Sequence, residues 1–293
     1  NDPVSNEDIY DLASITKIAA TTPILMKMVD SDEFDLYDKL GNYLDIDSIE
    51  KKHLVIREIL SHQARLFPWI PFYKSTLEQD SLSGLVKLKD TLYSHIESSD
   101  FPYKVADEIY LHFSYKDSII LRIYESDLLE EKEYYYSDLG FYLFKEIIEK
   151  NYGESLDQIV QSNFYKGLGM ENLGYLPLER ISKERIVPTE DDFKFRGQLL
   201  KGYVHDMGAA LQGGVGGHAG LFSNANDLAK LMQMYLQGGT YAGERYLSEE
   251  VINEFTRCQY CDQENRRGAG FDKPALENQE GGSASRRASP LSF

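Results

Sequence analysis

The sequence predicts a mostly helical globular protein in which strands are the minor component. Apolar residues recur at helical spacing in several segments, whereas alternating apolar and polar patterns are scarce. The chain has 293 residues, of which 42% are hydrophobic, enough for one large domain or two smaller lobes with a real core. Either the protein is mostly helical, or strands that would complete its sheet lie outside these residues.

Five segments carry the helical prediction. The first runs from Ser14 to about Asp30, with a kink expected at Pro23. The same periodicity predicts helices over residues 54–62, 137–151 and 156–165. A fifth follows Asn224, because Asp227 three residues later resembles a capping box, and it ends near residue 238. The best strand candidate covers residues 110–124.

Composition excludes several classes of function. Lys and Arg total 31 against 48 Asp and Glu, and a formal charge of −17 repels phosphate backbones, so nucleic acid is not an expected partner. No apolar run reaches the roughly 18 residues that a membrane helix needs, and no secretory leader pattern is found. We therefore expect neither a transmembrane segment nor a nucleic-acid-binding protein.

The two cysteines do not predict a metal site. Cys258 and Cys261 form a C-x-x-C, but a structural zinc site needs four ligands and the chain has no second pair. We interpret them as unrelated or weakly paired thiols. No cofactor and no metal are predicted.

The segment Ser14-Ile15-Thr16-Lys17 carries the first candidate for chemistry. In a helix, Ser14 and Lys17 are three residues apart on one face, so the ammonium is within reach of the hydroxyl. The alternative is an ordinary helix N-cap followed by a solvated lysine. The spacing alone does not decide between them, because Ser48-Ile49-Glu50-Lys51 has the same pattern in a charged stretch.

A second motif lies just before the helix predicted over residues 137–151. Tyr136-Ser137-Asp138 places a phenol and a carboxylate on either side of one residue. With S-x-x-K, this motif resembles the serine enzymes of the penicillin-interacting group, which combine S-x-x-K with S-D-N or Y-x-N and then K-T-G or H-x-G. The chain is similar to their class C-like branch, the β-lactamase-related and penicillin-binding-protein-like serine hydrolases.

Two alignments with the second family motif compete. Ser137-Asp138-Leu139 as S-D-N ends in an apolar residue, whereas Tyr136-Ser137-Asp138 as Y-x-N keeps both polar ends and is preferred. The resemblance then implies that Tyr136 moves protons between the nucleophile, the lysine and the leaving group. Asp138 replaces the family's Asn, and its carboxylate could hold the lysine in place of donating to a substrate carbonyl.

Three further segments resemble the family. Residues 56–66 are similar to L-L-T-H-x-S-G-L, with Ala64-Arg65 where Ser-Gly is usual, and we interpret His62 as structural. Residues 164–175 are similar to the P-L-G-M segment, and residues 216–239 are similar to the G-G-L-x-S-T-x-x-D-L helix entry. The resemblance therefore covers most of the chain.

The third family motif is harder to place. Within this chain, H-x-G occurs at His218-Ala219-Gly220, inside the glycine-dense segment 212–220. Because a capped helix follows directly, we assign these residues to a loop and not to the family's active-site strand, and we expect the true third motif beyond Phe293. His218 and Gly220 remain candidate substrate-binding residues, together with Ser137.

The resemblance implies an α/β (α+β) fold of the β-lactamase/transpeptidase type, with an antiparallel sheet flanked by helices and a helical lobe. Residues 1–293 then form a single truncated domain. Residues 30–215 are expected to form the helical lobe, and residues 1–29 and 216–293 parts of the α/β lobe. Strands missing at both ends would account for the helical bias.

The resemblance implies a serine acyl hydrolase that acts through an acyl-enzyme on an ester, peptide or β-lactam carbonyl. Its catalytic residues would be Ser14, Lys17, Tyr136 and Asp138, and its partner a small-molecule or peptide acyl substrate. The alternative is a non-catalytic module that binds cell-wall peptides or β-lactams. Residues 1–293 alone are expected to have little activity. A periplasmic or cell-envelope location, and in some relatives fusion to a family 3 glycoside hydrolase, are also implied.

Overall fold

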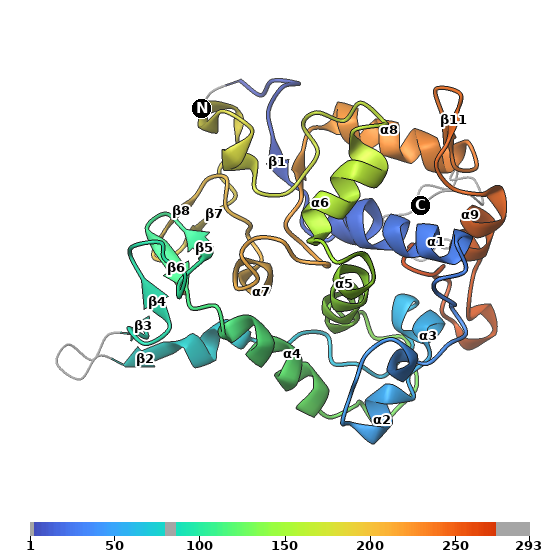
Figure 1. Cartoon of the computed structure of the whole chain (residues 1–293), viewed down its shortest axis with the longest axis horizontal. Coiled ribbons are helices and arrows are strands. Elements are labelled where there is room, and N and C mark those ends of the chain that lie inside the picture. The colour runs from blue at the N-terminus through green and yellow to red at the C-terminus, as the bar shows by residue number, and fades with distance from the viewer. Residues whose placement is uncertain (1–2, 80–85, 274–293) are drawn as a thin grey trace. The chain divides into compact units, whose positions relative to one another are not determined.

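The computed structural model describes residues 3–79 and 86–273 of the chain, which divides into two compact units (Figure 1). Unit 1 comprises Asn1–Thr21, Ile70–Ile123 and Phe141–Ala229, and unit 2 comprises Thr22–Trp69, Tyr124–Gly140 and Lys230–Phe293. The expected α/β class is confirmed, because helices are combined with small antiparallel sheets. Among the described residues, no helix combines the length and apolar character that crossing a bilayer requires.

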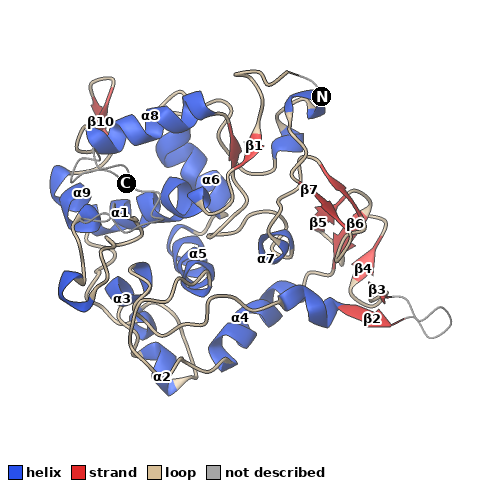
Figure 2. Cartoon of the chain, turned by 180° about the vertical axis from the view of Figure 1, so that it is seen from behind, coloured by secondary structure: helices blue, strands red, loops and turns tan. Residues whose placement is uncertain are grey.

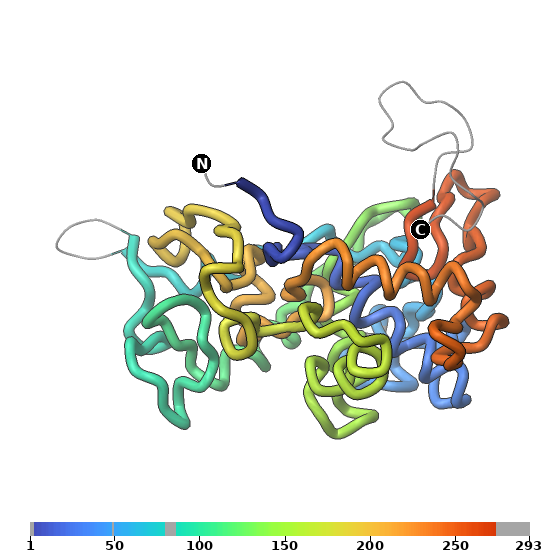
Figure 3. The backbone as a smooth tube through the Cα atoms, turned by 90° about the horizontal axis from the view of Figure 1, so that it is seen from above, coloured from blue at the N-terminus to red at the C-terminus, as the bar shows by residue number. Residues whose placement is uncertain are grey.

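Unit 1 holds most of the described strands, which are short, and β2 to β7 lie together at the right of Figure 2. Its strands are β1 (Tyr10–Asp11), β2 (Leu77–Gln79), β3 (Val86–Leu88), β4 (Tyr93–Ser94), β5 (Tyr103–Ala106), β6 (Ile109–Leu111), β7 (Glu190–Asp192), β8 (Gln198–Leu200) and β9 (Phe222–Ser223). They pair antiparallel as β1-β9, β2-β3, β4-β6-β5 and β7-β8. The β4-β6-β5 segment doubles back on itself in the teal and green part of Figure 3.

Unit 1 also contains helices. They are η1 (Lys17–Thr21), η3 (Phe72–Thr76), most of α4 (Tyr115–Glu125) and α5 (Leu139–Tyr152), α6 (Leu156–Val160), η4 (Gln161–Tyr165), η5 (Pro177–Glu179), η6 (Lys183–Arg185), α7 (Met207–Ala210) and the start of α8 (Ala225–Leu236). The Tyr165 hydroxyl donates to the Ala19 carbonyl at 2.7 Å, so η4 holds η1 by a buried hydrogen bond.

Unit 2 is largely helical. It contains α1 (Thr22–Asp30), η2 (Leu40–Asn42), α2 (Ile49–Lys52), α3 (Ile56–Leu60), most of α8, β10 (Thr240–Tyr241), β11 (Glu244–Arg245), α9 (Glu249–Thr256) and η7 (Cys261–Gln263). Helices α1 and α9 pack together, and the Asp30 carboxylate accepts both the backbone N–H and the hydroxyl of Ser248, the N-cap of α9. A hairpin joins β10 to β11.

The predicted helices are confirmed, with shifted ends. Residues 15–30 are helical throughout, and a widened π-helical stretch, η1, precedes Pro23 in place of a simple kink. The helices predicted at 54–62, 137–151 and 156–165 correspond to α3, to α5, and to α6 with η4. In front of α8, the Asn224 side chain accepts the Asp227 N–H at 3.0 Å, as the capping pattern predicts.

The strand predicted over residues 110–124 is wrong for most of its length. Only its first residues belong to β6, and α4 begins at Tyr115. The buried positions of α4 are Tyr115, Ile119 and Ile123, four residues apart, which is a helical period and not the alternation of a strand. The aromatic and β-branched content of the segment made it resemble a strand.

A buried ion pair fixes the hairpin of β7 and β8 in unit 1. Arg196 and Asp192 have side chains that are 0% and 1% exposed, and the Arg196 Nε lies 2.6 Å from the Asp192 Oδ2. The guanidinium also donates to the carbonyls of Val204 and His205. Burial opposes ionisation of Asp192, but Arg196 outweighs it and lowers the pKa of the carboxyl group below its usual 3.8.

We predict that Asp192→Asn destabilises the protein by about 3–5 kcal/mol, because it leaves a buried guanidinium without its charge partner. Asp191→Asn, at the exposed neighbouring position, should change the free energy of unfolding by less than about 0.5 kcal/mol. Urea unfolding of the wild type and the two variants measures both changes in the free energy of unfolding.

The difference between the wild type and Asp192→Asn should also depend on pH. A carboxyl group whose folded-state pKa is lowered contributes stability above its unfolded pKa and loses that contribution as the pH falls through the folded value. The difference should therefore be full at neutral pH and shrink below about pH 4. A pH-independent difference would contradict a role for the Asp192 charge.

Candidate active site

In unit 1, Ser14 lies in a tight turn between β1 and the helical run that begins at residue 15. The Asp11 carboxylate builds this turn, because it accepts the N–H of Ala13 at 2.8 Å and the N–H of His205 at 2.7 Å. Ala13 adopts a left-handed conformation with φ 45°, which costs energy for a residue with a Cβ. The turn therefore presents Ser14 at an exposed position by means of a strained backbone.

The Lys17 ammonium meets the Ser14 hydroxyl, as the S-x-x-K spacing predicts. Lys17 Nζ lies 2.8 Å from Ser14 Oγ, and the lysine is only 3% exposed. Nζ is also 3.4 Å from the carbonyl oxygen of His218 and 5.4 Å from the centre of the Phe141 ring. A buried lysine held against a serine hydroxyl can accept the hydroxyl proton when it is neutral and stabilise an alkoxide when it is charged.

His218 lies in a loop, as expected, and its side chain faces Asp206. His218 Nε2 is 2.7 Å from Asp206 Oδ1, and the imidazole stacks on the Tyr142 ring with 4.2 Å between ring centres. Because a carboxylate only accepts, Nε2 carries the proton in this pair. Desolvation raises the pKa of Asp206, but His218, the Ala209 N–H and the Lys17 charge outweigh it and hold the pKa well below its usual range.

Two threonine hydroxyls hold the glycine-dense loop against the helical run that follows Ser14. The Thr21 hydroxyl donates to the Gly217 carbonyl at 2.6 Å, and the Leu221 N–H donates to the Thr16 hydroxyl at 3.2 Å. A Cβ at Gly217 would lie 2.1 Å from the Phe141 carbonyl oxygen, and Gly220 has φ 122°, so both positions require glycine. These contacts hold the His218 carbonyl in front of Lys17.

After the loop, β9 pairs with β1, the strand that leads into the Ser14 turn. The register places Tyr10 opposite Ser223 and Asp11 opposite Phe222, and the Leu12 N–H donates to the Leu221 carbonyl at 2.9 Å. The assignment of His218 to a loop is thus confirmed, but the segment after this loop does form a short strand beside the strand that leads to Ser14. Helical periodicity did not reveal a strand of only two residues.

Asp11 and Asp206 were not predicted as part of this site. Both act through backbone N–H groups, Asp11 in the turn before Ser14 and Asp206 as the N-cap of α7, where its Oδ1 accepts the Ala209 N–H at 2.7 Å. The sequence held one signal for Asp206, since an Asp directly before the small-residue run 207–210 is typical of an N-cap. Nothing in the sequence linked it to His218.

In unit 2, Tyr136, Ser137 and Asp138 form the entry to α5. The Ser137 hydroxyl donates to the Phe67 carbonyl at 2.6 Å and accepts the Leu139 N–H at 3.2 Å, so this side chain is buried and ties down the start of the helix. The Asp138 N–H donates to the Pro68 carbonyl at 2.9 Å. A substrate-binding role for Ser137 remains a prediction, and its visible contacts are structural.

Tyr136 is 37% exposed, and its ring contacts two other side chains. The centre of the Tyr136 ring is 4.4 Å from the centre of the His62 ring, and the Arg267 guanidinium lies over the Tyr136 ring at 5.6 Å from its centre. His62 is buried, and its Nδ1 accepts the Ser137 N–H at 3.1 Å. The imidazole thus connects the segment before α5 to the end of α3, in keeping with the structural role expected for it.

Ala64-Arg65 stands where the family has Ser-Gly, and the backbone at Arg65 keeps a conformation typical of glycine. Arg65 has φ 64°, a left-handed conformation that glycine adopts without strain. Its Nε donates to the Leu129 carbonyl at 2.5 Å. This bond fixes a conformation that an arginine otherwise disfavours.

The second S-x-x-K does not form the same contact. Ser48 caps α2, with its hydroxyl accepting the backbone N–H of Lys51 at 3.4 Å. The Lys51 ammonium bonds instead with the carbonyls of Tyr124 and Ser126, and burial lowers the pKa of Lys51. The two S-x-x-K segments therefore differ in their tertiary contacts, because only Ser14-Ile15-Thr16-Lys17 places the lysine ammonium against the serine hydroxyl.

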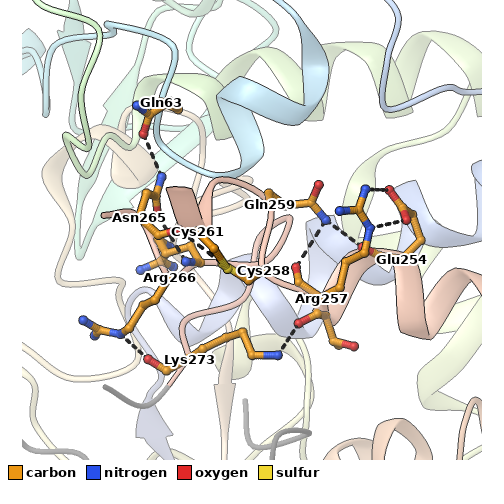
Figure 4. The surroundings of a disulfide bond; sticks show 11 residues. Gln63, Glu254, Arg257, Cys258, Gln259, Cys261, Asn265, Arg266 and Lys273 are labelled. Carbon is orange, nitrogen blue, oxygen red and sulfur yellow. Dashed lines mark hydrogen bonds and ion pairs between the residues drawn. A yellow bond between two sulfur atoms is a disulfide. The ribbon is translucent and has the colours of Figure 1, made fainter. Parts of the chain in front are cut away.

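The interpretation of the cysteines as unrelated or weakly paired thiols is wrong, because Cys258 and Cys261 form a disulfide (Figure 4). Their Cα atoms are 5.8 Å apart, within the range for this bond. Nearby, the Asn265 amide donates to the Ser61 carbonyl and to Gln63. Within residues 3–79 and 86–273, no His, Cys, Asp or Glu residues gather in a group that could hold a metal ion.

The sequence of this chain is similar to that of a known protein. The chain is 31% identical over 268 residues to a Salmonella typhimurium protein provisionally named D-alanyl-D-alanine carboxypeptidase, covering 85% of this chain and 56% of that protein. The chain thus spans little more than half the length of this relative.

Two solved structures share the fold at lower identity. One is an octameric penicillin-binding protein homologue from Pyrococcus abyssi, with TM-score 0.58, 20% identity, and 87% of this chain and 50% of that chain covered. The other is a class C β-lactamase from Rhodobacter sphaeroides, with TM-score 0.55, 16% identity, and 87% and 58% covered. The family model of the β-lactamases matches residues 1–274, and the chain therefore belongs to the β-lactamase family.

Proposed function

We propose that this protein is a serine acyl hydrolase in which Ser14 is the nucleophile and Lys17 its proton acceptor. The observation that carries the proposal is the 2.8 Å contact between Lys17 Nζ and the Oγ of Ser14, a residue at an exposed position. Ser14 Oγ would attack the carbonyl carbon of an ester, peptide or β-lactam while its proton passes to Lys17. The leaving group would take a proton as its bond to the carbonyl carbon breaks, and water would then release the acyl group from Ser14.

The turn that presents Ser14 supports this role. A serine near the start of a helix experiences the positive end of the helix dipole, which stabilises negative charge on its oxygen. The strained Ala13 and the Asp11 contacts fix where Oγ lies before a substrate arrives. Preorganisation of this kind favours attack over rearrangement of the site.

We infer that His218 and Asp206 position Lys17. Lys17 Nζ approaches the His218 backbone carbonyl, and the His218 side chain is anchored by Asp206 and by stacking on Tyr142. His218 would therefore act as a positioning residue and not as a substrate ligand. Gly220 would serve the same loop through its left-handed conformation.

Tyr136 and Asp138 keep the roles that the family motif predicts for them. Tyr136 would move a proton toward the leaving group, and Asp138 stands where the family has an amide donor. Because Asp138 lacks that donor, the proposed site is less suited to β-lactams than to other acyl substrates. An envelope location and a fused glycoside hydrolase domain remain predictions from the resemblance.

The substrate proposed first is a peptide that ends in D-amino acids, because the relative from Salmonella typhimurium is named for that activity. A panel of nitrocefin, p-nitrophenyl esters and D-Ala-D-Ala peptides discriminates between the substrate classes. The alternative function, a binding module without turnover, is favoured by Asp138 and by the Ala64-Arg65 departure. Tight peptide binding with no acyl adduct in mass spectrometry would support that alternative.

A fluorophosphonate probe should label the wild type, and labelling should be abolished in Ser14→Ala. Ser48→Ala is the matched control, since it removes the serine of the other S-x-x-K and should cost only about 0.5–2 kcal/mol of stability as a lost cap. Labelling is read by gel fluorescence and by intact mass. Equal labelling of the wild type and Ser14→Ala would contradict the assignment of Ser14 as the nucleophile.

Replacing Tyr136 by Phe should lower the acylation rate by roughly 10²- to 10⁴-fold, the usual contribution of a general acid or base. Tyr135→Phe is the control, because the hydroxyl of Tyr135 is exposed and bonds with Glu133. Stopped-flow acylation kinetics compare the two. A Tyr136→Phe rate within threefold of the control would rule out proton relay by this residue.

His218→Gln should lower kcat and leave KM nearly unchanged, because it acts on Lys17 and not on the substrate. Loss of a hydrogen bond to a charged partner costs about 1.5–3 kcal/mol, which corresponds to roughly a 10- to 150-fold loss of rate. His205→Gln is the control, since its side chain is 54% exposed. A raised KM at constant kcat would indicate direct substrate binding by His218.

A further inference from the structure

In unit 2, the ring of Tyr136 contacts a cation and an imidazole. The Arg267 guanidinium lies over the phenol ring at 5.6 Å from its centre, and the His62 ring is 4.4 Å away between ring centres. Tyr136 is 37% exposed, so part of its ring faces solvent and these contacts limit how far the ring can turn. The position of the phenol hydroxyl therefore depends on Arg267 as well as on His62.

Arg267 is buried without a close carboxylate. Its side chain is 10% exposed, and the ion pair that it forms within the described residues joins it to Asp272 at 3.7 Å. Asp272 is 54% exposed and lies closer to Arg266, at 3.2 Å. Arg267 Nη1 is 3.5 Å from the Tyr134 hydroxyl, and its Nε has no acceptor among the described residues. A guanidinium can stack on an aromatic face as well as pair with a carboxylate, and the Tyr136 ring supplies that face.

Hydrogen bonds fix the backbone that carries Arg267. The Arg267 N–H donates to Asn265 Oδ1 at 3.1 Å, and the Arg267 carbonyl accepts the Gln259 N–H at 2.9 Å. The Asn265 amide nitrogen donates in turn to the carbonyl of Ser61, the residue before His62, at 2.9 Å. Asn265 therefore links the segment of Arg267 to the segment of His62, and both neighbours of the Tyr136 ring belong to one hydrogen-bonded framework.

The role proposed for Tyr136 sets a geometric requirement. A proton passes only between groups within hydrogen-bond reach of one another, so a phenol ring that turns away cannot transfer it. A cation over an aromatic face attracts the electrons of the ring, and this attraction is stronger where water is excluded. Because Arg267 is buried, its guanidinium can hold the half-exposed ring of Tyr136 in one orientation.

We propose that Arg267 is a positioning residue for Tyr136. Its guanidinium holds the phenol ring beside the His62 imidazole, in the orientation that proton transfer needs. Arg267 acts through this ring and neither contacts the substrate nor exchanges a proton. The inference rests on the catalytic role proposed for Tyr136, but the effect of Arg267 on the ring can be measured without any reaction.

The first test incorporates 3-fluorotyrosine in place of Tyr136 in the whole chain and records its fluorine NMR resonance. Arg267→Met should move this resonance toward its position in the urea-unfolded protein, whereas Arg267→Lys, which keeps a cation, should move it less. Arg266→Met is the matched control, because it removes the neighbouring arginine, whose side chain is 49% exposed, and it should leave the resonance unchanged. A resonance that Arg267→Met leaves in place would overturn the proposal.

Circular dichroism and urea unfolding establish that each variant is folded. If Arg267→Met does not fold, Arg267→Gln takes its place, since it also removes the cation but keeps a polar side chain. Equal displacement of the resonance by Arg267→Lys and by the variant without a cation would contradict positioning by charge and overturn the proposal.

The second test asks whether the position of the ring matters to the reaction. Arg267→Met should lower the acylation rate by about tenfold to a hundredfold, the usual cost of a misplaced catalytic group, and leave KM nearly unchanged. Arg267→Lys should restore part of this rate. In a Tyr136→Phe background, Arg267→Met should change the rate by less than about threefold, because its effect passes through the missing hydroxyl. Equal losses in both backgrounds would overturn the proposal.

The two tests separate this inference from the proposed function. A Tyr136→Phe variant as active as the wild type would contradict proton transfer by Tyr136, and the fluorine resonance would still decide whether Arg267 holds the ring. A large loss of rate in Tyr136→Phe, together with no displacement of the resonance in Arg267→Met, would overturn positioning by Arg267 and leave the role of Tyr136 intact.

Discussion

The buried ammonium of Lys17 is the constraint on which the Ser14 site depends. Lys17 is only 3% exposed, so its amine group needs hydrogen-bond partners inside the protein, because an unpaired buried polar group is costly. Two of these partners are the Ser14 hydroxyl and the His218 carbonyl. The first is the proposed reacting group, and the second belongs to a loop more than 200 residues along the chain. Lys17 therefore requires both segments to hold fixed positions.

That requirement explains the conformations on either side of Lys17. Ala13 is left-handed because the chain must leave β1 and enter a helix within three residues, and Asp11 stabilises the turn with two backbone contacts. The loop carries glycine at 217 because a side chain there would collide with the Phe141 carbonyl. The Asp206 contact then fixes the imidazole of the residue whose carbonyl faces Lys17.

Much of this architecture was predictable from sequence periodicity, and the exceptions have physical causes. Helix α5 was identified because its apolar residues repeat over 14 residues. The segment of α4 was assigned to a strand because its isoleucines and tyrosines favour strands locally, whereas burial of every fourth residue favoured a helix. Strands β1 and β9 have two residues each and pair with one another, and Phe222 of β9 also forms a bridge with Gly174, so these strands depend on contacts between distant segments.

By itself, the sequence determined the family, the helical segments and the two S-x-x-K candidates, because motif spacing and helical periodicity are local properties. Only the tertiary structure shows how the surroundings of Ser14 and Ser48 differ. Both lysines follow a serine by three residues, but Lys51 is drawn to the carbonyls of Tyr124 and Ser126, whereas Lys17 is confined beside Ser14 by the His218 loop. The pairings of Asp206 with His218 and of Cys258 with Cys261 were also decided by the fold, since each depends on how the chain turns and not on spacing alone.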